Sequence, residues 1–207
     1  MGRIITVSRE FGTLGRPLAK KVAEKLNFRY MDPELLERAA VKLGKTPEEL
    51  EIYDNQRVIY THLDGSKYVK MAHPLGLGDD RLQRKLFQAE KEIMLKEAEK
   101  EDLLIVGRAA DYIFSGIGKE DLLRIHICAP YEYRFQKAVE YLKMSKTEAR
   151  EHIRIIDKAR GAFYKQITGE DFRSPLYRDL ILNVENCTED SAINTICAVA
   201  CVRFHLS

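Results

Sequence analysis

The sequence predicts an α/β fold built around a parallel β-sheet. Short apolar runs of strand length alternate along the 207 residues with segments whose apolar residues recur at helical spacing. One of these runs, residues 103–106, is continuously apolar, as in a central strand covered on both faces. Strands that alternate with helices form parallel sheets through right-handed crossovers, and ligands bind such sheets beyond the carboxyl ends of the strands. We therefore expect a functional site at that edge.

The first 26 residues predict a strand, a glycine-bearing loop and a helix. Residues 4–7 form the apolar strand, and residues 8–17 lead to a helix in which Leu18, Val22 and Leu26 share one face. Free N–H groups of the first helical turn and the positive end of the helix dipole face such a loop. This arrangement suits an anion such as a phosphate.

Two glycines of this loop, Gly12 and Gly15, allow the backbone to wrap a phosphate without interference from a Cβ atom. Pro17 is expected at the first helical position, where its missing N–H has no intrahelical partner. The loop departs from the phosphate-loop pattern G-x-x-x-x-G-K-[ST], because Glu10, Arg16 and Pro17 replace the first glycine, the lysine and the hydroxyl. By itself, the unit fits an ordinary α/β connection equally well.

Cap residues place the elements of the first half of the chain. After a short strand at 28–31, Asp32 followed by proline predicts a helix to about Leu43, which Gly44 closes. The further predicted elements are a helix from a capping box at 46–49 to about Val58, a loop at 73–78, and a helix from Asp79 or Asp80 to about Lys100.

The second half continues the alternation of strands and helices. Its predicted elements are the strand at 103–106 with a short helix after Gly107-Arg108, a strand at 122–128, a helix from Pro130, a helix from the capping box at 145–148 to about Lys165, a strand at 180–182, and a terminal helix capped by Thr188. The helix over 145–165 is heavily charged and has few apolar anchors. We expect it to pack weakly in the free protein and to close over bound phosphates.

The composition describes a soluble globular protein, with 45% hydrophobic and 32% charged residues. Thirty-four basic and 32 acidic residues leave a net charge of +2, so we expect neither a nucleic-acid partner nor a membrane partner. Basic and aromatic residues alternate faintly at 57–60 and 67–70. We interpret the first as a half-buried helix face and the second as a hairpin or loop.

The four cysteines lie in the second half without zinc-like spacing, and Cys197 and Cys201 are expected on the core face of the terminal helix. The chain opens without a signal-peptide pattern, and no apolar run approaches the ~20 residues that span a bilayer. We therefore expect a cytoplasmic protein with reduced thiols.

Four short motifs together resemble the cytidylate kinase-like family, a divergent branch of the nucleoside monophosphate kinases. They are Ser8-Arg9-Glu10-Phe11-Gly12 with Gly15-Arg16, Val106-Gly107-Arg108-Ala109-Ala110, Asp157-Lys158-Ala159-Arg160, and Tyr177-Arg178-Asp179-Leu180-Ile181-Leu182-Asn183. The resemblance extends to about Cys201. It implies a three-layer αβα P-loop kinase fold with a five-stranded parallel sheet and a helical lid. The chain, 1–207, would be one domain with an acceptor-binding segment at about 32–82 and a lid at about 145–170.

The resemblance also implies site residues, carried over position by position. The donor phosphates would meet Gly12, Thr13, Gly15 and Arg16, the monophosphate would meet Asp32, Arg38 and Arg108, and the catalytic residues would be Arg16, Asp157 and Arg160. The implied cofactors are ATP and Mg²⁺, and the implied partner is a small-molecule nucleotide. Phosphoryl transfer requires mainly positioning and neutralisation of charge, which forked arginine donors supply.

The chain also departs from the family pattern. Leu14 stands where a glycine is more usual, and Ala109 replaces an acid, which leaves Asp111 or Asp32 as metal-side carboxylates. Two functions stay open. The first is a nucleotide kinase that transfers the γ-phosphoryl group of ATP to a pyrimidine nucleoside monophosphate resembling CMP or dCMP. The second is a catalytically impaired protein that binds or senses nucleotides on the same fold.

Overall fold

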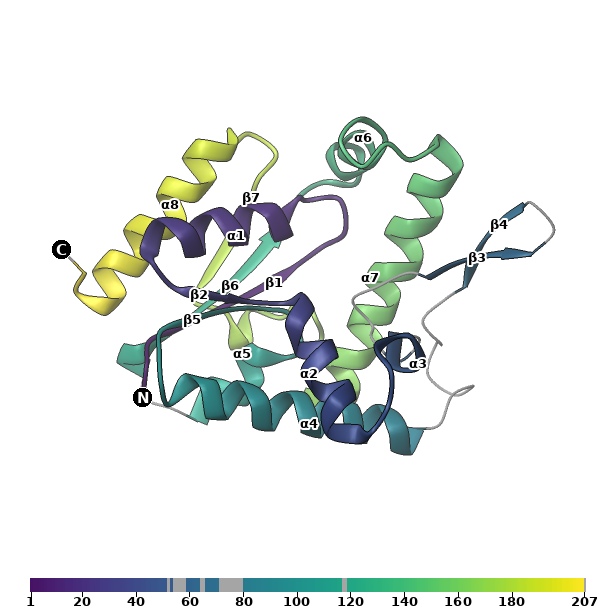
Figure 1. Cartoon of the computed structure of the whole chain (residues 1–207). Coiled ribbons are helices and arrows are strands. Elements are labelled where there is room, and N and C mark those ends of the chain that lie inside the picture. The colour runs from purple at the N-terminus through teal and green to yellow at the C-terminus, as the bar shows by residue number, and fades with distance from the viewer. Residues whose placement is uncertain (52, 54–58, 64–65, 71–79, 117–118, 207) are drawn as a thin grey trace.

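Five parallel strands form the central sheet of the computed structural model, which describes all residues except 52, 54–58, 64–65, 71–79, 117–118 and 207 (Figure 1). The strands are β1 (Ile4–Arg9), β2 (Arg29–Met31), β5 (Leu103–Val106), β6 (Leu122–Cys128) and β7 (Leu180–Asn183). Their order in the sheet is β2-β5-β1-β6-β7, so the first strand is central. Every neighbouring pair is parallel, which confirms the predicted sheet.

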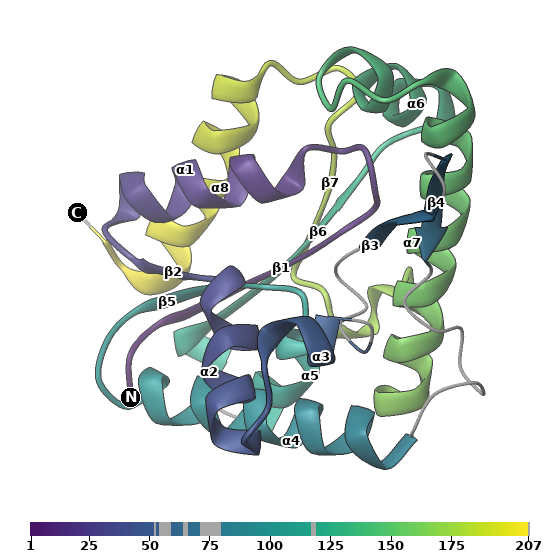
Figure 2. The same cartoon turned by 45° about the vertical axis from the view of Figure 1, so that its right-hand side comes forward.

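Helices cover both faces of this sheet and complete three layers (Figures 1 and 2). Helices α1 (Gly15–Leu26) and α8 (Glu189–Phe204) pack on one face, over a core that includes Val7 and Ile125. A second core lies on the other face, where Ile105 packs with α2 (Pro33–Leu43), α4 (Asp80–Ala98) and α5 (Ala110–Ile113). The apolar strand residues therefore alternate between two cores, as expected of a doubly covered sheet.

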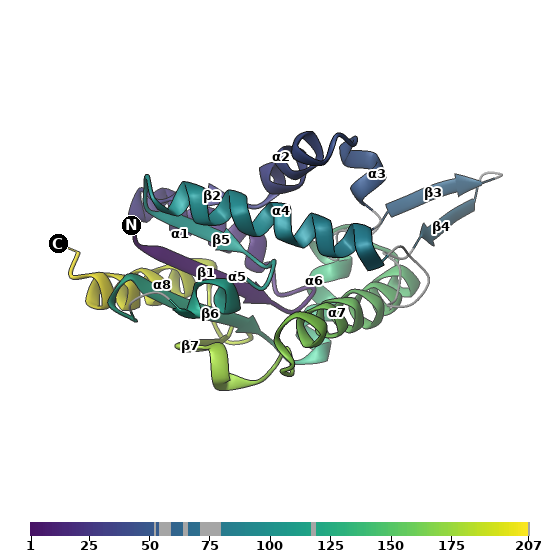
Figure 3. The ribbon, with the colours of Figure 1, turned by 90° about the horizontal axis from the view of Figure 1, so that it is seen from below.

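Two helices stand beyond the carboxyl ends of the central strands, α6 (Tyr131–Glu140) and α7 (Lys146–Thr168) (Figure 2). After the short helix α3 (Pro47–Glu51), strands β3 (Ile59–Leu63) and β4 (Ser66–Lys70) form an antiparallel hairpin. This hairpin projects from the body of the molecule (Figure 3). Short 3₁₀ turns complete the fold at Phe114–Gly116, Lys119–Asp121 and Pro175–Tyr177.

Most of the predicted helix boundaries are confirmed. Gly44 ends α2 with a φ of +64°, and the side chain of Thr188 caps α8. The capping box at Ser145 is formed in both directions with Glu148. In the described part of the chain, no helix is long and apolar enough to cross a membrane.

Three predicted boundaries differ from the structure. Helix α1 begins at Gly15, so Pro17 occupies its third position, where an N–H would still lack an intrahelical acceptor. Helix α3 ends at Glu51, and the predicted end of that helix, Val58, lies outside the described residues, as does the predicted loop at 73–78. The segment from Ile59 is a strand rather than a helix face.

The expectation of a weakly packed helix over 145–165 is wrong. Eight residues of α7 are buried: Ala149, His152, Ile153, Ile155, Ile156, Arg160, Phe163 and Tyr164. The C-terminal aromatics form a separate cluster with Phe172 and Ala109. Charged residues interrupt the apolar spacing of this helix in the sequence. One of them, Arg160, is itself buried in the structure.

Candidate functional site at the carboxyl edge of the sheet

The loop between β1 and α1 is shaped by two residues with a left-handed backbone. Gly12 has a φ of +83°, and Leu14, directly before the helix, has a φ of +56°. A Cβ atom on Gly12 would lie 2.6 Å from the carbonyl oxygen of Arg134 in α6, so glycine is required there. Leu14 holds a conformation that is uncommon for a residue with a side chain. Such backbone conformations cluster at functional sites.

The amides at the centre of this loop are available to an anion. Those of Gly12, Thr13 and Leu14 have no hydrogen-bond acceptor within the described ranges, and the first amides of α1 follow directly. The hydroxyl proton of Thr13 is already used, because Thr13 Oγ1 donates to the carbonyl oxygen of Glu10 at 2.9 Å. The loop amides are therefore the donors left for an anion. A row of amides at a helix N-terminus binds phosphate, carboxylate or sulfate groups.

Arg16 and Asp32 link the loop to the end of β2. The Arg16 guanidinium donates to both carboxylate oxygens of Asp32, through Nε to Oδ2 and through Nη2 to Oδ1 at 3.0 Å. Asp32 is 1% exposed. Burial raises the pKa of this carboxyl, but the charges of Arg9, Arg16 and Arg108 outweigh that effect and hold the pKa below its usual range. The carboxylate is therefore engaged by arginines and does not cap α2.

Arg108 occupies the end of the neighbouring strand β5. Three consecutive residues there have a positive φ, namely Gly107 at +77°, Arg108 at +61° and Ala109 at +51°. The Arg108 side chain is buried and pairs with Glu90 of α4 at 2.5 Å. Arg108 also lines the small cavity with Arg9, and its charge acts on Asp32. The predicted residues Arg16, Asp32 and Arg108 are thus brought together.

The motif of helix α7 reaches the same loop. Asp157 Oδ1 accepts from the amide of Phe11 at 2.8 Å, and Asp157 Oδ2 pairs with Arg134 Nη1 at 2.5 Å. Arg160 Nη1 donates to the carbonyl oxygen of Arg9 at 3.0 Å and lies 4.0 Å from Asp157. Both predicted residues of α7 therefore lie against the loop, although part of their bonding is to the backbone and to Arg134.

Sequence reasoning missed three residues of this site. Arg9 is 4% exposed, and burial followed by the charge of Arg160 lowers the pKa of its guanidinium well below the usual value. Glu10 pairs with Arg173 at 2.8 Å and lies 3.5 Å from Arg134. Arg9 and Glu10 belong to the first motif, but only their neighbours were assigned roles. Arg134 has no motif signal, because it lies within the apolar pattern of α6.

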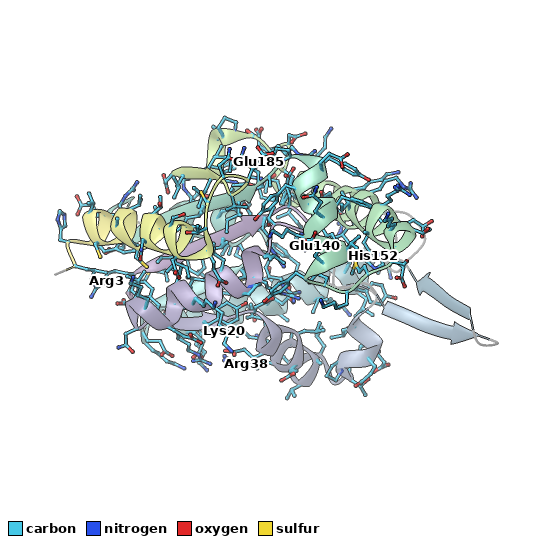
Figure 4. All side chains as sticks on the ribbon, turned by 90° about the horizontal axis from the view of Figure 1, so that it is seen from above. Arg3, Lys20, Arg38, Glu140, His152 and Glu185 are labelled. Atoms are coloured by element: carbon cyan, nitrogen blue, oxygen red, sulfur yellow. The ribbon has the colours of Figure 1, made fainter. Side chains whose placement is uncertain are left out.

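Two other acidic and basic candidates are engaged elsewhere. Arg38 points to Glu97 at 2.9 Å, in a group with Arg29 at the start of β2, so the structure does not bring it to the carboxyl edge (Figure 4). The Asp111 carboxylate pairs with Arg178 and accepts from the Tyr164 hydroxyl at 3.2 Å. Burial lowers the pKa of Arg178 to about 10.

Two hollows adjoin these residues. A cavity of about 20 Å³, room for about one water, is lined by Arg9, Arg108 and Arg160, by Asp111, and by aromatic and small residues. A larger hollow of about 610 Å³ lies between α6, α7 and residues 171–173. Tyr131 and Lys158 line it, as do Arg134 and Asp157, which also contact the loop. Arg134 and Asp157 therefore connect the larger hollow to the loop between β1 and α1.

The described side chains do not offer a ligand set for Mg²⁺. No group of three His, Cys, Asp or Glu residues that could hold a metal occurs among the described residues. Of the two carboxylates expected on the metal side, Asp32 is held by Arg16, and Asp111 is held by Arg178. Hard divalent cations are bound by oxygen ligands, and both of these carboxylates are already neutralised. The described carboxylates of this edge therefore do not form a metal site of their own.

Comparison with known proteins gives a family and a fold. A model of the cytidylate kinase-like family matches residues 4–186. None of the curated proteins matches the chain.

Solved structures share the fold at low sequence identity. An uncharacterized protein from Eubacterium ventriosum is 21% identical, with a TM-score of 0.70 over 96% of this chain and 98% of its own. A shikimate kinase from Bacteroides thetaiotaomicron is 14% identical, with a TM-score of 0.54 over the same shares. A shikimate kinase from Aquifex aeolicus is 14% identical, with a TM-score of 0.50 over 95% of each chain. These likenesses confirm the three-layer P-loop kinase fold.

Proposed function

The chain belongs to the cytidylate kinase-like family, and on that premise we propose that it is a nucleotide kinase. In this proposal it transfers the γ-phosphoryl group of ATP to a pyrimidine nucleoside monophosphate such as CMP or dCMP. ATP enters as its magnesium complex, in which the phosphate oxygens carry the ion. The chain acts as a single domain, with an acceptor-binding segment at about 32–82 and a lid at about 145–170.

One observation carries the proposal. Free loop amides at a helix N-terminus and the buried side chains of Arg9, Arg108 and Arg160 converge on one edge of the sheet. Buried cations are costly unless an anion or a carboxylate compensates them. Arg108 and Arg160 have carboxylate neighbours, but Arg9 has none among the described residues, so its buried charge beside the free loop amides favours a polyphosphate ligand. A structural ion-pair network alone would not require the loop amides to be left without acceptors.

The proposed reaction uses these groups for positioning and for charge stabilisation. The donor phosphates lie against the amides of residues 12–16, and the acceptor phosphate lies near Arg108 at the end of β5. An oxygen of the acceptor phosphate attacks the γ-phosphorus, the bond to the bridging β–γ oxygen breaks, and ADP leaves. Arg16 and Arg160 neutralise the charge that spreads over the transferred group. Asp157 orients Arg160 and the loop amide of Phe11.

The large hollow between α6 and α7 supports a place for the donor nucleoside. It shares Arg134 and Asp157 with the loop, and Tyr131 offers an aromatic surface that is 43% exposed. Aromatic rings stack on nucleobases without strong selectivity. This position leaves the side of Asp32 and Arg108 to the acceptor.

The test is a ligand screen followed by an assay of turnover. Melting temperatures are measured with nucleoside mono-, di- and triphosphates, with and without Mg²⁺, because a ligand at 100 times its Kd stabilises the fold by about 2.7 kcal/mol. ADP formation from ATP is then measured with CMP, dCMP, UMP and AMP as acceptors. Turnover with a pyrimidine monophosphate supports the kinase.

A second candidate function follows from the altered loop. Arg16 and Pro17 stand directly after Gly15, where a phosphate loop has a lysine and a hydroxyl residue, and Arg16 is already paired with Asp32. This observation favours a protein that binds or senses nucleotides without turnover. Stabilisation by ATP with no ADP formation for any acceptor would select this alternative. No stabilisation by any nucleotide would exclude both functions.

A further inference from the structure

Among the described residues of the carboxyl edge, Arg9 is the cation whose charge no carboxylate contact balances. Arg16 pairs with Asp32, Arg108 pairs with Glu90, and Arg160 lies 4.0 Å from Asp157. Arg9 forms no ion pair with a carboxylate of the described residues, and its Nη2 atom is buried without a hydrogen-bond partner there. Arg9 is nonetheless only 4% exposed.

The surroundings of Arg9 increase this imbalance. Burial and the nearby charges of Arg160 and Arg16 disfavour the protonated guanidinium, and only Asp32 and Tyr30 act in the opposite direction. Asp32 is already bound bidentately by Arg16. A buried cation in this environment lowers the stability of the free protein, so its presence indicates that a ligand supplies the missing negative charge.

Its position in the chain defines where that ligand lies. Arg9 is the last residue of β1, directly before the loop, and its Cβ and Cγ atoms lie beneath Gly15 at the first turn of α1. A Cβ atom added to Gly15 would be only 2.9 Å from the Cβ of Arg9. The guanidinium is close enough to Asp32, at the end of β2, for the two charges to interact. The Arg9 side chain thus lies between the donor loop and the start of the acceptor segment.

We infer that Arg9 binds the γ-phosphoryl group of the donor and replaces the lysine that is missing from the loop. This assignment rests on the proposed nucleotide kinase function. A γ-phosphoryl group bound over the first turn of α1 and next to Arg9 supplies the anion that the site lacks. Arg16 remains fixed by Asp32 and contributes through the guanidinium nitrogen that does not bind this carboxylate.

The test compares ATP with ADP, because only ATP carries the γ-phosphoryl group. Calorimetric titrations of the whole chain measure both affinities for the wild type, for Arg9→Met and for Lys20→Met. Lys20 is an exposed residue of α1, so its substitution removes the same charge outside the site (Figure 4). We expect Arg9→Met to weaken ATP binding by about tenfold or more and to leave ADP binding nearly unchanged. Lys20→Met should leave the ratio of the two affinities as in the wild type.

The melting temperature of the ligand-free protein gives an independent result. Methionine reproduces the aliphatic part of the arginine side chain without its charge, so Arg9→Met should melt at the same temperature as the wild type or higher, because a buried unpaired cation has been removed. A purely structural arginine would instead make the variant melt earlier and would leave the ratio of ATP to ADP affinity unchanged. Arg9→Lys should restore part of the preference for ATP.

The outcomes separate this assignment from the function on which it rests. A wild type that prefers ATP over ADP, together with an Arg9→Met variant that keeps the same preference, overturns the role of Arg9 and leaves the kinase proposal standing. A wild type that binds neither nucleotide overturns both. An equal loss of ATP and ADP affinity in Arg9→Met also overturns the assignment, because the arginine would then contact phosphates that the two nucleotides share.

Discussion

Asp157 of helix α7 accepts a hydrogen bond from the backbone amide of Phe11 at 2.8 Å, across 146 residues of sequence. The same carboxylate pairs with Arg134, and Arg134 Nη1 also donates to the carbonyl oxygen of Phe11 at 3.2 Å. Both backbone groups of Phe11 are therefore bound by side chains from α6 and α7. The loop and the two helices beyond the sheet form one hydrogen-bonded unit, and the loop conformation depends on α7.

Asp157→Ala should destabilise the protein by less than the about 3–5 kcal/mol that is typical of breaking a buried ion pair, because Arg134 loses Asp157 at 2.5 Å but keeps Glu10 at 3.5 Å. It should also increase hydrogen exchange in the loop at residues 10–14, whose Phe11 amide loses its acceptor. Chemical denaturation and hydrogen-exchange mass spectrometry measure the two effects. Glu151→Ala, on an exposed position of the same helix, is the matched control. Exchange in the loop that stays at the wild-type rate would show that α7 does not hold it.

Arg108 should bind the acceptor phosphate, but its ion pair with Glu90 must be treated as a unit. Arg108→Ala alone leaves a buried carboxylate, so the informative variant is Arg108→Met with Glu90→Gln, which removes both charges. We expect this double variant to weaken monophosphate binding by about 10- to 100-fold, as for a lost charged hydrogen bond of about 1.5–3 kcal/mol, and to change ATP binding less. Calorimetric titrations measure both, with Glu90→Gln alone as the control.

Equal losses for the monophosphate and for ATP would move Arg108 out of the acceptor side of the site. Titrations of the Glu90→Gln single variant show how much of the loss comes from the change at Glu90 alone.

His126 should make stability depend on pH between about 4 and 6.5. Burial lowers the pKa of this histidine to about 4, and its Nδ1 lies 2.8 Å from the Ser8 hydroxyl. In this window the unfolded chain binds more protons at His126 than the folded protein, so the free energy of unfolding rises with pH. The contribution is lost as pH falls, by up to about 1.4 kcal/mol per unit.

Denaturation of His126→Gln at several pH values checks this linkage. The slope between pH 4 and 6.5 should be smaller in the variant than in the wild type. Identical slopes in His126→Gln and the wild type would show that the imidazole is protonated in the folded state as readily as in the unfolded chain.

Much of the fold could be predicted because its signals are local. Residues 103–106 are apolar without interruption, and cap residues such as Ser145 and Thr188 fix where helices begin. The packing of α7 could not be predicted, because its buried face mixes apolar residues with Arg160 and His152. A periodicity of apolar residues does not reveal a buried charge, whose partners come from distant parts of the chain.

The site could be predicted only where a motif coincided with a strand end. Arg16, Asp32 and Arg108 follow three different strands, and parallel strands bring such positions to one edge. Arg38 matched the family by position, yet Glu97 of α4 attracts it to the opposite end of β2. Arg9 was missed because the residues around it, such as Arg108 of the β5 end and Arg160 of α7, come from distant parts of the chain.

Arg160 is the residue of α7 that should stabilise the transferred phosphoryl group. Its guanidinium lies next to the loop through its bond to the Arg9 carbonyl, and Asp157 is one turn away. Because charge develops on the transferred group only during the reaction, Arg160→Ala should lower kcat by about 100-fold or more and leave ATP affinity nearly unchanged. Steady-state kinetics with the acceptor found in the ligand screen, together with ATP titration, measures the two effects. Lys146→Ala, an exposed cation at the start of the same helix, controls for the loss of charge. A normal kcat in a folded Arg160→Ala protein would show that this arginine serves only to hold α7 against the loop.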